Sequence, residues 1–115
     1  MEAFEFTAVP DAPSPPMHLH RTAEELFYVV SGRMEFTVDG RVVAAQAGDA
    51  LLVPRNTPHM FRYVGEEPVR MIAQLMPAIG LDDYFSKLAA IVRESSPPDR
   101  VKMTALAAQY DQPAA

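Results

Sequence analysis

Three histidines and one carboxylate are the residues of this sequence best suited to hold a metal ion. One residue separates His18 from His20, Glu25 follows five residues after His20, and His59 comes later, directly after Pro58. On an extended chain, side chains two residues apart point to the same face, about 6.5–7 Å apart. Three imidazole nitrogens and one carboxylate oxygen suit a divalent first-row transition metal and can leave coordination positions open for water or substrate.

The spacing of the histidines alone is weak evidence, because a histidine in a strand more often lies at the surface or in a satisfied core. The metal hypothesis is stronger here because all three histidines of the chain lie at boundaries between a turn and a predicted strand, with a carboxylate in reach. The sequence contains no cysteine, which excludes disulfides, thiolate chemistry and zinc fingers. Any metal ligands must therefore be His, Asp or Glu.

Short apolar stretches bounded by turn residues predict β-strands between residues 3 and 77. Residues 34–38 alternate apolar and polar side chains at the period of two that a half-buried strand requires, and Asp39-Gly40 is a strong hairpin signal. We expect roughly eight strands, at spacings typical of an antiparallel sandwich or barrel. The proline-rich segment 10–16 is expected to be an irregular loop.

After Pro77 the pattern changes to helical periodicity. Apolar side chains recur at helical spacing over residues 81–93, which predicts an amphipathic helix. A second short helix is expected to end at about Gln109, and residues 112–115 are expected to be a frayed tail.

Length and charge narrow the class of protein. The 115 residues suit one globular unit, which we divide into a β-barrel at 1–77 and a C-terminal helical extension at 78–111. The formal net charge of −5, with no cluster of Lys or Arg, argues against a nucleic-acid partner. The apolar runs are too short to span a bilayer and the acidic start is unlike a signal peptide, so we expect a cytoplasmic protein without a membrane partner.

Two ordered motifs of the chain resemble those of the cupin family: His18-X-His20-X4-Glu25-X6-Gly32 and Gly48-X5-Pro54-X-Asn56-X2-His59. The fifteen residues between the two motifs fit the intermotif region of the smallest cupins. The resemblance covers roughly residues 3–77. It implies an all-β double-stranded β-helix, also called a jelly-roll barrel, followed by one or two α-helices.

The resemblance also implies that the four matched side chains bind one divalent transition metal ion: Fe, Mn, Ni, Co, Cu or Zn. Glu24 is the rival carboxylate because the family tolerates either spacing, but the interval from Glu25 to Gly32 favours Glu25. Three positions depart from the family motifs without removing a ligand: Ala12, Asn56 and Tyr63.

Side chains with the same strand parity as the ligands are expected to line the barrel interior. The candidate substrate-pocket residues are Phe27, Val29, Met34, Phe36, Phe61 and Tyr63. Most positions of this kind are simply core. Together, however, an apolar and partly aromatic wall beside a metal is the usual form of a small-molecule site and would suit a phenolic substrate.

Residues 25–30, 54–61 and 80–85 resemble the quercetin-dioxygenase-like branch of small cupins. This implies a metal-dependent dioxygenase acting on a small enolic or phenolic substrate, with Glu25 as the catalytic base. Two alternatives stay open: a non-catalytic cupin that binds or senses a small molecule, and a metal-dependent isomerase or cyclase.

A homodimer is expected, because small cupins usually dimerise and the helix at 81–93 needs a surface on which to bury its apolar face. That surface is either its own barrel or a partner subunit.

Overall fold

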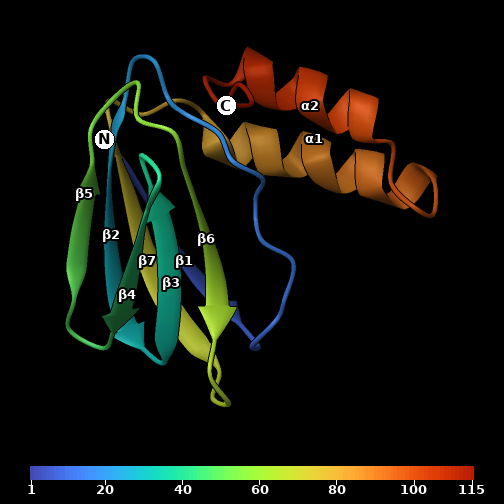
Figure 1. Ribbon diagram of the computed structural model, residues 1–115. Coiled ribbons are helices and arrows are strands. Elements are labelled where there is room, and N and C mark those ends of the chain that lie inside the picture. Colours follow the sequence, from blue (N-terminus) through green and yellow to red (C-terminus); the bar gives the residue numbers. More distant parts are fainter.

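Two antiparallel β-sheets face each other and enclose the core. The computed structural model describes all residues, 1–115. Its strands are β1 (Glu2–Ala8), β2 (Glu24–Ser31), β3 (Arg33–Val38), β4 (Arg41–Gln46), β5 (Ala50–Val53), β6 (His59–Val64) and β7 (Val69–Met76). One sheet has the order β1-β7-β2-β5 and the other the order β4-β3-β6, as Figure 1 shows. This is the double-stranded β-helix that the family resemblance implies.

The structure has seven strands rather than the roughly eight that we expected, and the segment between β1 and β2 forms none. It rises beside β6 (Figure 1) and makes only an isolated bridge, in which His18 and His59 exchange two backbone hydrogen bonds of 3.0 and 2.8 Å. Proline has no N–H to donate to a ladder, and four prolines precede His18 in this segment. The segment can therefore place His18 against β6 without becoming a regular strand.

Tight turns set the register of the strands. Asp39 and Gly40, both with positive φ, join β3 to β4, which confirms the predicted hairpin. Gly32 lies between β2 and β3 with φ +81°, and a Cβ at this position would lie 2.7 Å from the carbonyl oxygen of Pro68. Only glycine fits there, because the chain leading into β7 passes directly over the turn.

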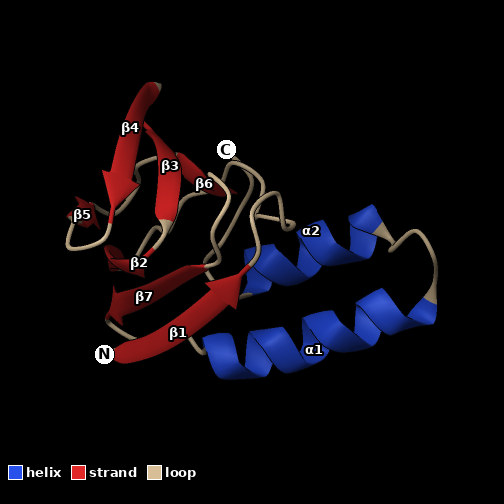
Figure 2. Ribbon diagram, turned by 90° about the horizontal axis from the view of Figure 1, so that it is seen from below, coloured by secondary structure: helices blue, strands red, loops and turns tan.

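Two helices follow the strands: α1 (Leu81–Glu94) and α2 (Arg100–Gln109). The ring of Phe85 on α1 meets the rings of Phe4 and Phe6 edge-on, at centroid distances of 5.7 and 5.8 Å. Phe4 and Phe6 pair with the buried Ala73 and Met71 across the strands, so all four side chains lie on the core side of the sheet. Helix α1 thus covers the inner face of the sheet at the β1 edge, beside which both helices run in Figure 2.

Neither helix combines the length and the apolar composition that crossing a bilayer would require.

The last residues of the chain are not frayed, which corrects our expectation. Leu19 N–H donates to the carbonyl oxygen of Pro113, and Ala115 N–H donates to that of Met17, both at 3.1 Å. The tail therefore pairs with the segment that carries His18 and His20. Sequence could not reveal this, because the tail has no apolar pattern and is held by backbone groups that every residue possesses.

Candidate metal centre

The four predicted ligands come from three segments of the chain and meet at one end of the barrel. His18 and His20 lie on the segment before β2, Glu25 is the second residue of β2, and His59 is the first residue of β6. One donor atom from each side chain lies within 4.8 Å of all the others. All four residues are buried, and each is at most 7% exposed.

Each histidine ring is turned the same way, because its Nδ1–H donates to a backbone carbonyl oxygen. The three pairs are His18 to Pro16 at 2.8 Å, His59 to Thr57 at 2.9 Å, and His20 to Asp111 at 2.8 Å. A carbonyl oxygen can only accept, so the hydrogen must be on Nδ1. The other ring nitrogen, Nε2, is then the one available to bind a metal. The carbonyl oxygen that accepts from Nδ1–H orients the ring for this role.

Glu25 faces the Nε2 atoms of two of these rings. Its Oε1 lies 2.9 Å from Nε2 of His20 and 3.3 Å from Nε2 of His59. With the hydrogen on Nδ1, a neutral imidazole presents a lone pair at Nε2, and a lone pair against a carboxylate is repulsive. The arrangement therefore requires a positive charge at this point, which either a proton or a metal cation can supply.

The surroundings of each group decide its charge in the absence of a metal. Burial, together with the nearby His59, lowers the pKa of His18 from 6.5 to about 4. Burial also disfavours ionisation of Glu25, but the hydrogen bonds from His20 and His59 outweigh it and bring the pKa of Glu25 below its usual value. His18 is therefore neutral and Glu25 ionised near neutral pH, which are the states that bind metal.

His20 holds a proton more strongly than a free histidine. Burial alone would lower its pKa, but the hydrogen bond and the negative charge of Glu25 raise it above 6.5 overall. A cation that enters this position must displace that proton.

The size of the cluster fits a metal ion. Bonds of about 2.1 Å to nitrogen and oxygen place two ligand atoms at most about 4.2 Å apart. The observed limit of 4.8 Å exceeds this by about 0.6 Å. The residues present therefore fit one divalent transition metal bound by three nitrogens and one oxygen.

Glu24 lies outside the cluster. Successive side chains of a strand point to opposite faces, so Glu24 points away from the side that Glu25 occupies. Its carboxylate lies 3.9 Å from the guanidinium of Arg55, and the side chains of Arg55 and Glu24 are 52% and 42% exposed.

The six predicted pocket residues lie inside the barrel, but they pack against one another. Five of them are buried members of the main core, and Phe61 is half-buried against it. The ring of Phe27 lies 6.1 Å from the ring of His59, so this aromatic group forms the floor beneath the ligands. Their role in binding a substrate stays a prediction.

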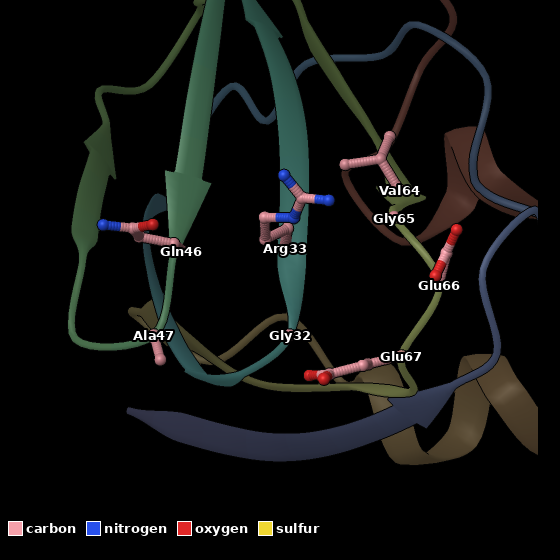
Figure 3. Close-up of a pocket in the computed structure, with 8 residues that line it drawn as sticks. All are labelled: Gly32, Arg33, Gln46, Ala47, Val64, Gly65, Glu66 and Glu67. Carbon is pink, nitrogen blue, oxygen red and sulfur yellow. The ribbon is translucent and has the colours of Figure 1, made fainter.

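A hollow on the surface lies away from the cluster. Figure 3 shows it, with a volume of about 600 Å³, lined by Gly32, Arg33, Gln46, Ala47, Val64, Gly65, Glu66 and Glu67. Val64 ends β6 and Gly32 follows the end of β2, whereas the ligands His59 and Glu25 lie at the beginnings of the same strands. The hollow is thus at the opposite end of the barrel from the metal cluster.

Sequence reasoning missed Asp111. Its carbonyl oxygen accepts the Nδ1–H of His20, 91 residues away along the chain. A backbone carbonyl has no residue signature, and no spacing rule connects positions so far apart.

Comparison with known proteins agrees with this geometry. A family model described as a cupin domain matches residues 4–75. Polyketide synthase CurC from Streptomyces cyaneus is 42% identical over 60 residues, which are 52% of this chain and 39% of that protein. Quercetin 2,3-dioxygenase from Bacillus subtilis is 34% identical over 71 residues, 62% of this chain and 20% of that protein.

Among solved structures, a cupin protein from Bacteroides fragilis matches with a TM-score of 0.59 at 23% identity, over 64% of this chain and 62% of that one. At this identity the likeness shows the fold alone. The chain spans about half the length, or less, of the curated relatives it matches. The matching family model covers well over half of the chain and contains all four clustered side chains, and the protein is therefore a member of the cupin family.

Proposed function

We propose that this cupin binds one divalent transition metal ion through His18, His20, Glu25 and His59, and that it is a metal-dependent dioxygenase for a small enolic or phenolic substrate. The observation that carries the proposal is the buried meeting of three imidazoles with one carboxylate, an arrangement that needs a positive charge between them. The dioxygenase part is supported by the 34% identity with quercetin 2,3-dioxygenase.

A metal ion held here would supply Lewis-acid or redox activation of a substrate oxygen. The protein's own groups supply the rest. The Glu25 carboxylate would serve as the general base, accepting a proton from an enolic or phenolic hydroxyl when it loosens from the metal. The rings of Phe27 and Phe61, 5.6 Å apart by their centroids, form an apolar floor that excludes water from one side of the site.

One observation favours a second candidate function, the binding or sensing of a small molecule without turnover. The side chains expected to line a substrate cavity are packed as core, with Phe27, Met34 and Phe36 each 1% exposed. A small acidic ligand bound at the metal needs less space inside the barrel than a flavonol does.

Metal analysis of the purified protein tests metal binding. We expect about one ion per chain in the wild type and a sharply lower content in His59→Ala, which lacks one of the four ligands. Glu25→Gln should also lose metal. Glu24→Gln, which removes the same charge from the outer face of β2, is the matched control and should retain it. Full metal content in both His59→Ala and Glu25→Gln would refute the assignment.

Oxygen uptake by the metal-loaded protein separates the two candidate functions. With a flavonol or an enediol, a dioxygenase consumes oxygen, and Glu25→Gln should reduce this rate more than Glu24→Gln does. Tight binding of such a compound without oxygen uptake or product would favour the sensing function.

A further inference from the structure

We infer that the C-terminal segment Asp111–Ala115, referred to below as the C-terminal strap, is a positioning element of the metal centre, and that Asp111 holds the ligand His20 in its binding orientation. This inference rests on the proposed metal binding, and it goes beyond it by assigning a role to residues outside the cupin motifs.

The three histidines differ in where their orienting carbonyl comes from. His18 and His59 each donate to the carbonyl of the residue two positions earlier, so each ring is held within its own turn. His20 has no such local partner and donates to Asp111, 91 residues further along the chain. The orientation of His20 therefore depends on the docking of a remote segment.

Asp111 also holds the turn that follows His20. Its carboxylate accepts hydrogen bonds from Arg21 N–H at 2.7 Å, from Thr22 N–H at 3.0 Å and from the Thr22 hydroxyl at 2.7 Å. Arg21 and Thr22 lie between the two ligands His20 and Glu25 in the sequence. One residue thus fixes the ring of His20 through its carbonyl and the connection to Glu25 through its carboxylate.

The backbone of the strap supports the same segment. Its hydrogen bonds to Met17 and Leu19 lie on either side of His18, and an isolated bridge joins His18 to Ala114. Figure 1 shows the C-terminus lying at the end of the barrel where this segment leads into β2. The strap acts there as an extra pairing partner for a segment whose prolines prevent it from forming a regular strand.

Helix α1 anchors the start of the strap through Tyr110. The Tyr110 hydroxyl donates to the carboxylate of Asp83 and accepts from Lys87 Nζ at 2.6 Å, and its ring packs against Tyr84 at a centroid distance of 5.7 Å. Asp111 itself has φ +57°, a conformation that Asp and Asn tolerate better than most residues. The residue type at 111 therefore matters both for the backbone turn and for the hydrogen bonds.

The test compares Asp111→Ala, which removes the carboxylate, with Asp111→Asn, which keeps one acceptor oxygen and the tolerance of positive φ. Asp99→Ala is the matched control: Asp99 also accepts a backbone N–H, that of Lys102 at 3.1 Å, but at the start of α2 and outside the site. Co²⁺ affinity is measured by titration calorimetry, and the Nδ1–H proton of His20 is followed by NMR in the metal-free protein.

Asp111→Ala keeps the carbonyl that His20 contacts, but without the carboxylate residue 111 is no longer fixed against Arg21 and Thr22, so the hydrogen bond from His20 weakens. Loss of an outer hydrogen-bond partner of a ligand typically lowers metal affinity about 10- to 100-fold. We expect a rise of that size in the Kd for Co²⁺ in Asp111→Ala, together with loss of the slowly exchanging Nδ1–H signal of His20. Asp111→Asn should retain most of the wild-type affinity for Co²⁺ and most of the His20 signal. Asp99→Ala should lower the unfolding midpoint without changing the Kd or the His20 signal, which separates positioning from general stability.

Wild-type affinity and an intact His20 signal in Asp111→Ala would overturn the inference and leave metal binding standing. If the wild type bound no Co²⁺ at all, the proposed function would fail, and the His20 signal of metal-free Asp111→Ala would still decide the positioning role. Should Asp111→Ala not fold, Asp111→Gly removes the same carboxylate and tolerates the positive φ at this position. An unchanged Kd and His20 signal in that variant would equally refute the role.

Discussion

At the scale of single residues, His18 and His20 share one cluster and yet differ in how strongly they hold a proton. Burial and the neighbouring His59 lower the pKa of His18 to about 4, so it offers a free lone pair at neutral pH. Glu25 lies against His20 and raises the pKa of that ring above 6.5 despite its burial. A metal that binds here therefore displaces a proton from His20 but none from His18.

This difference predicts the pH dependence of metal binding. Below the raised pKa of His20 the ring is protonated, so binding releases its proton and affinity falls by about tenfold for each unit of pH lost. Above that pKa the ring of His20 is already neutral, so a further rise in pH brings no gain in metal affinity from this residue. Calorimetric titration with Co²⁺ in buffers of different ionisation enthalpy measures the protons released. Metal affinity that stays constant through the range in which histidine titrates would contradict this assignment.

At the scale of secondary-structure elements, the turn between β2 and β3 connects the ligand-bearing strand to the opposite sheet. Gly32 and Gly40 both have φ near +80°, so a side chain at either position strains the backbone. They differ in their surroundings. A Cβ at Gly32 would meet Pro68 and the Cα of Val69 at 2.7 and 2.9 Å, whereas no atom lies within 4 Å of a Cβ at Gly40.

We expect Gly40→Ala to lower the free energy of unfolding by about 1 kcal/mol, the cost of the backbone strain alone. Gly32→Ala adds a clash with backbone atoms that cannot move independently, and should cost about 2–4 kcal/mol. Urea denaturation of the two variants measures the difference. Equal losses would mean that the chain entering β7 does not pass as close to Gly32 as the structure has it.

At the scale of the whole molecule, the surface is larger than expected for a monomer. The accessible area is 6832 Å² for 12.7 kDa, against about 6,200 Å² for a folded monomer of this mass. Exposed and half-buried apolar side chains gather on the outer face of β2, β5 and β7, where Leu26, Tyr28, Ala50 and Ile72 line a pocket of about 260 Å³ with Gln74. Leu52, beside them on β5, is 52% exposed.

We propose that a second copy of the chain covers this face. Strand β5 is an edge of its sheet, and two copies of an edge strand can pair antiparallel about a two-fold axis. Light scattering after gel filtration should give the mass of a dimer, and Leu52→Glu should give a monomer. Val101→Glu, at a 79% exposed apolar position on α2, is the control and should stay dimeric. A monomeric wild type would refute the proposal.

The sequence by itself determined the features that repeat locally. The period of two in the strands, the Asp39-Gly40 hairpin and the helical spacing after Pro77 all follow from backbone geometry, which restricts the side chains that each element can carry. The spacing of the two motifs likewise indicated His18, His20, Glu25 and His59, which the structure brings together in one buried cluster. Local periodicity can be interpreted without knowing what packs against it.

Only the tertiary structure decided which surfaces and backbone groups meet. It showed that the interior aromatic residues pack as core, that the segment before β2 bridges to β6 without forming a strand, and that the tail docks beside His18. The orienting contact of His20 with Asp111 joins residues 91 positions apart through a backbone carbonyl. Every residue has such a carbonyl, so the sequence does not indicate which one accepts the hydrogen bond from His20. The tertiary fold decides which carbonyl lies next to the ring.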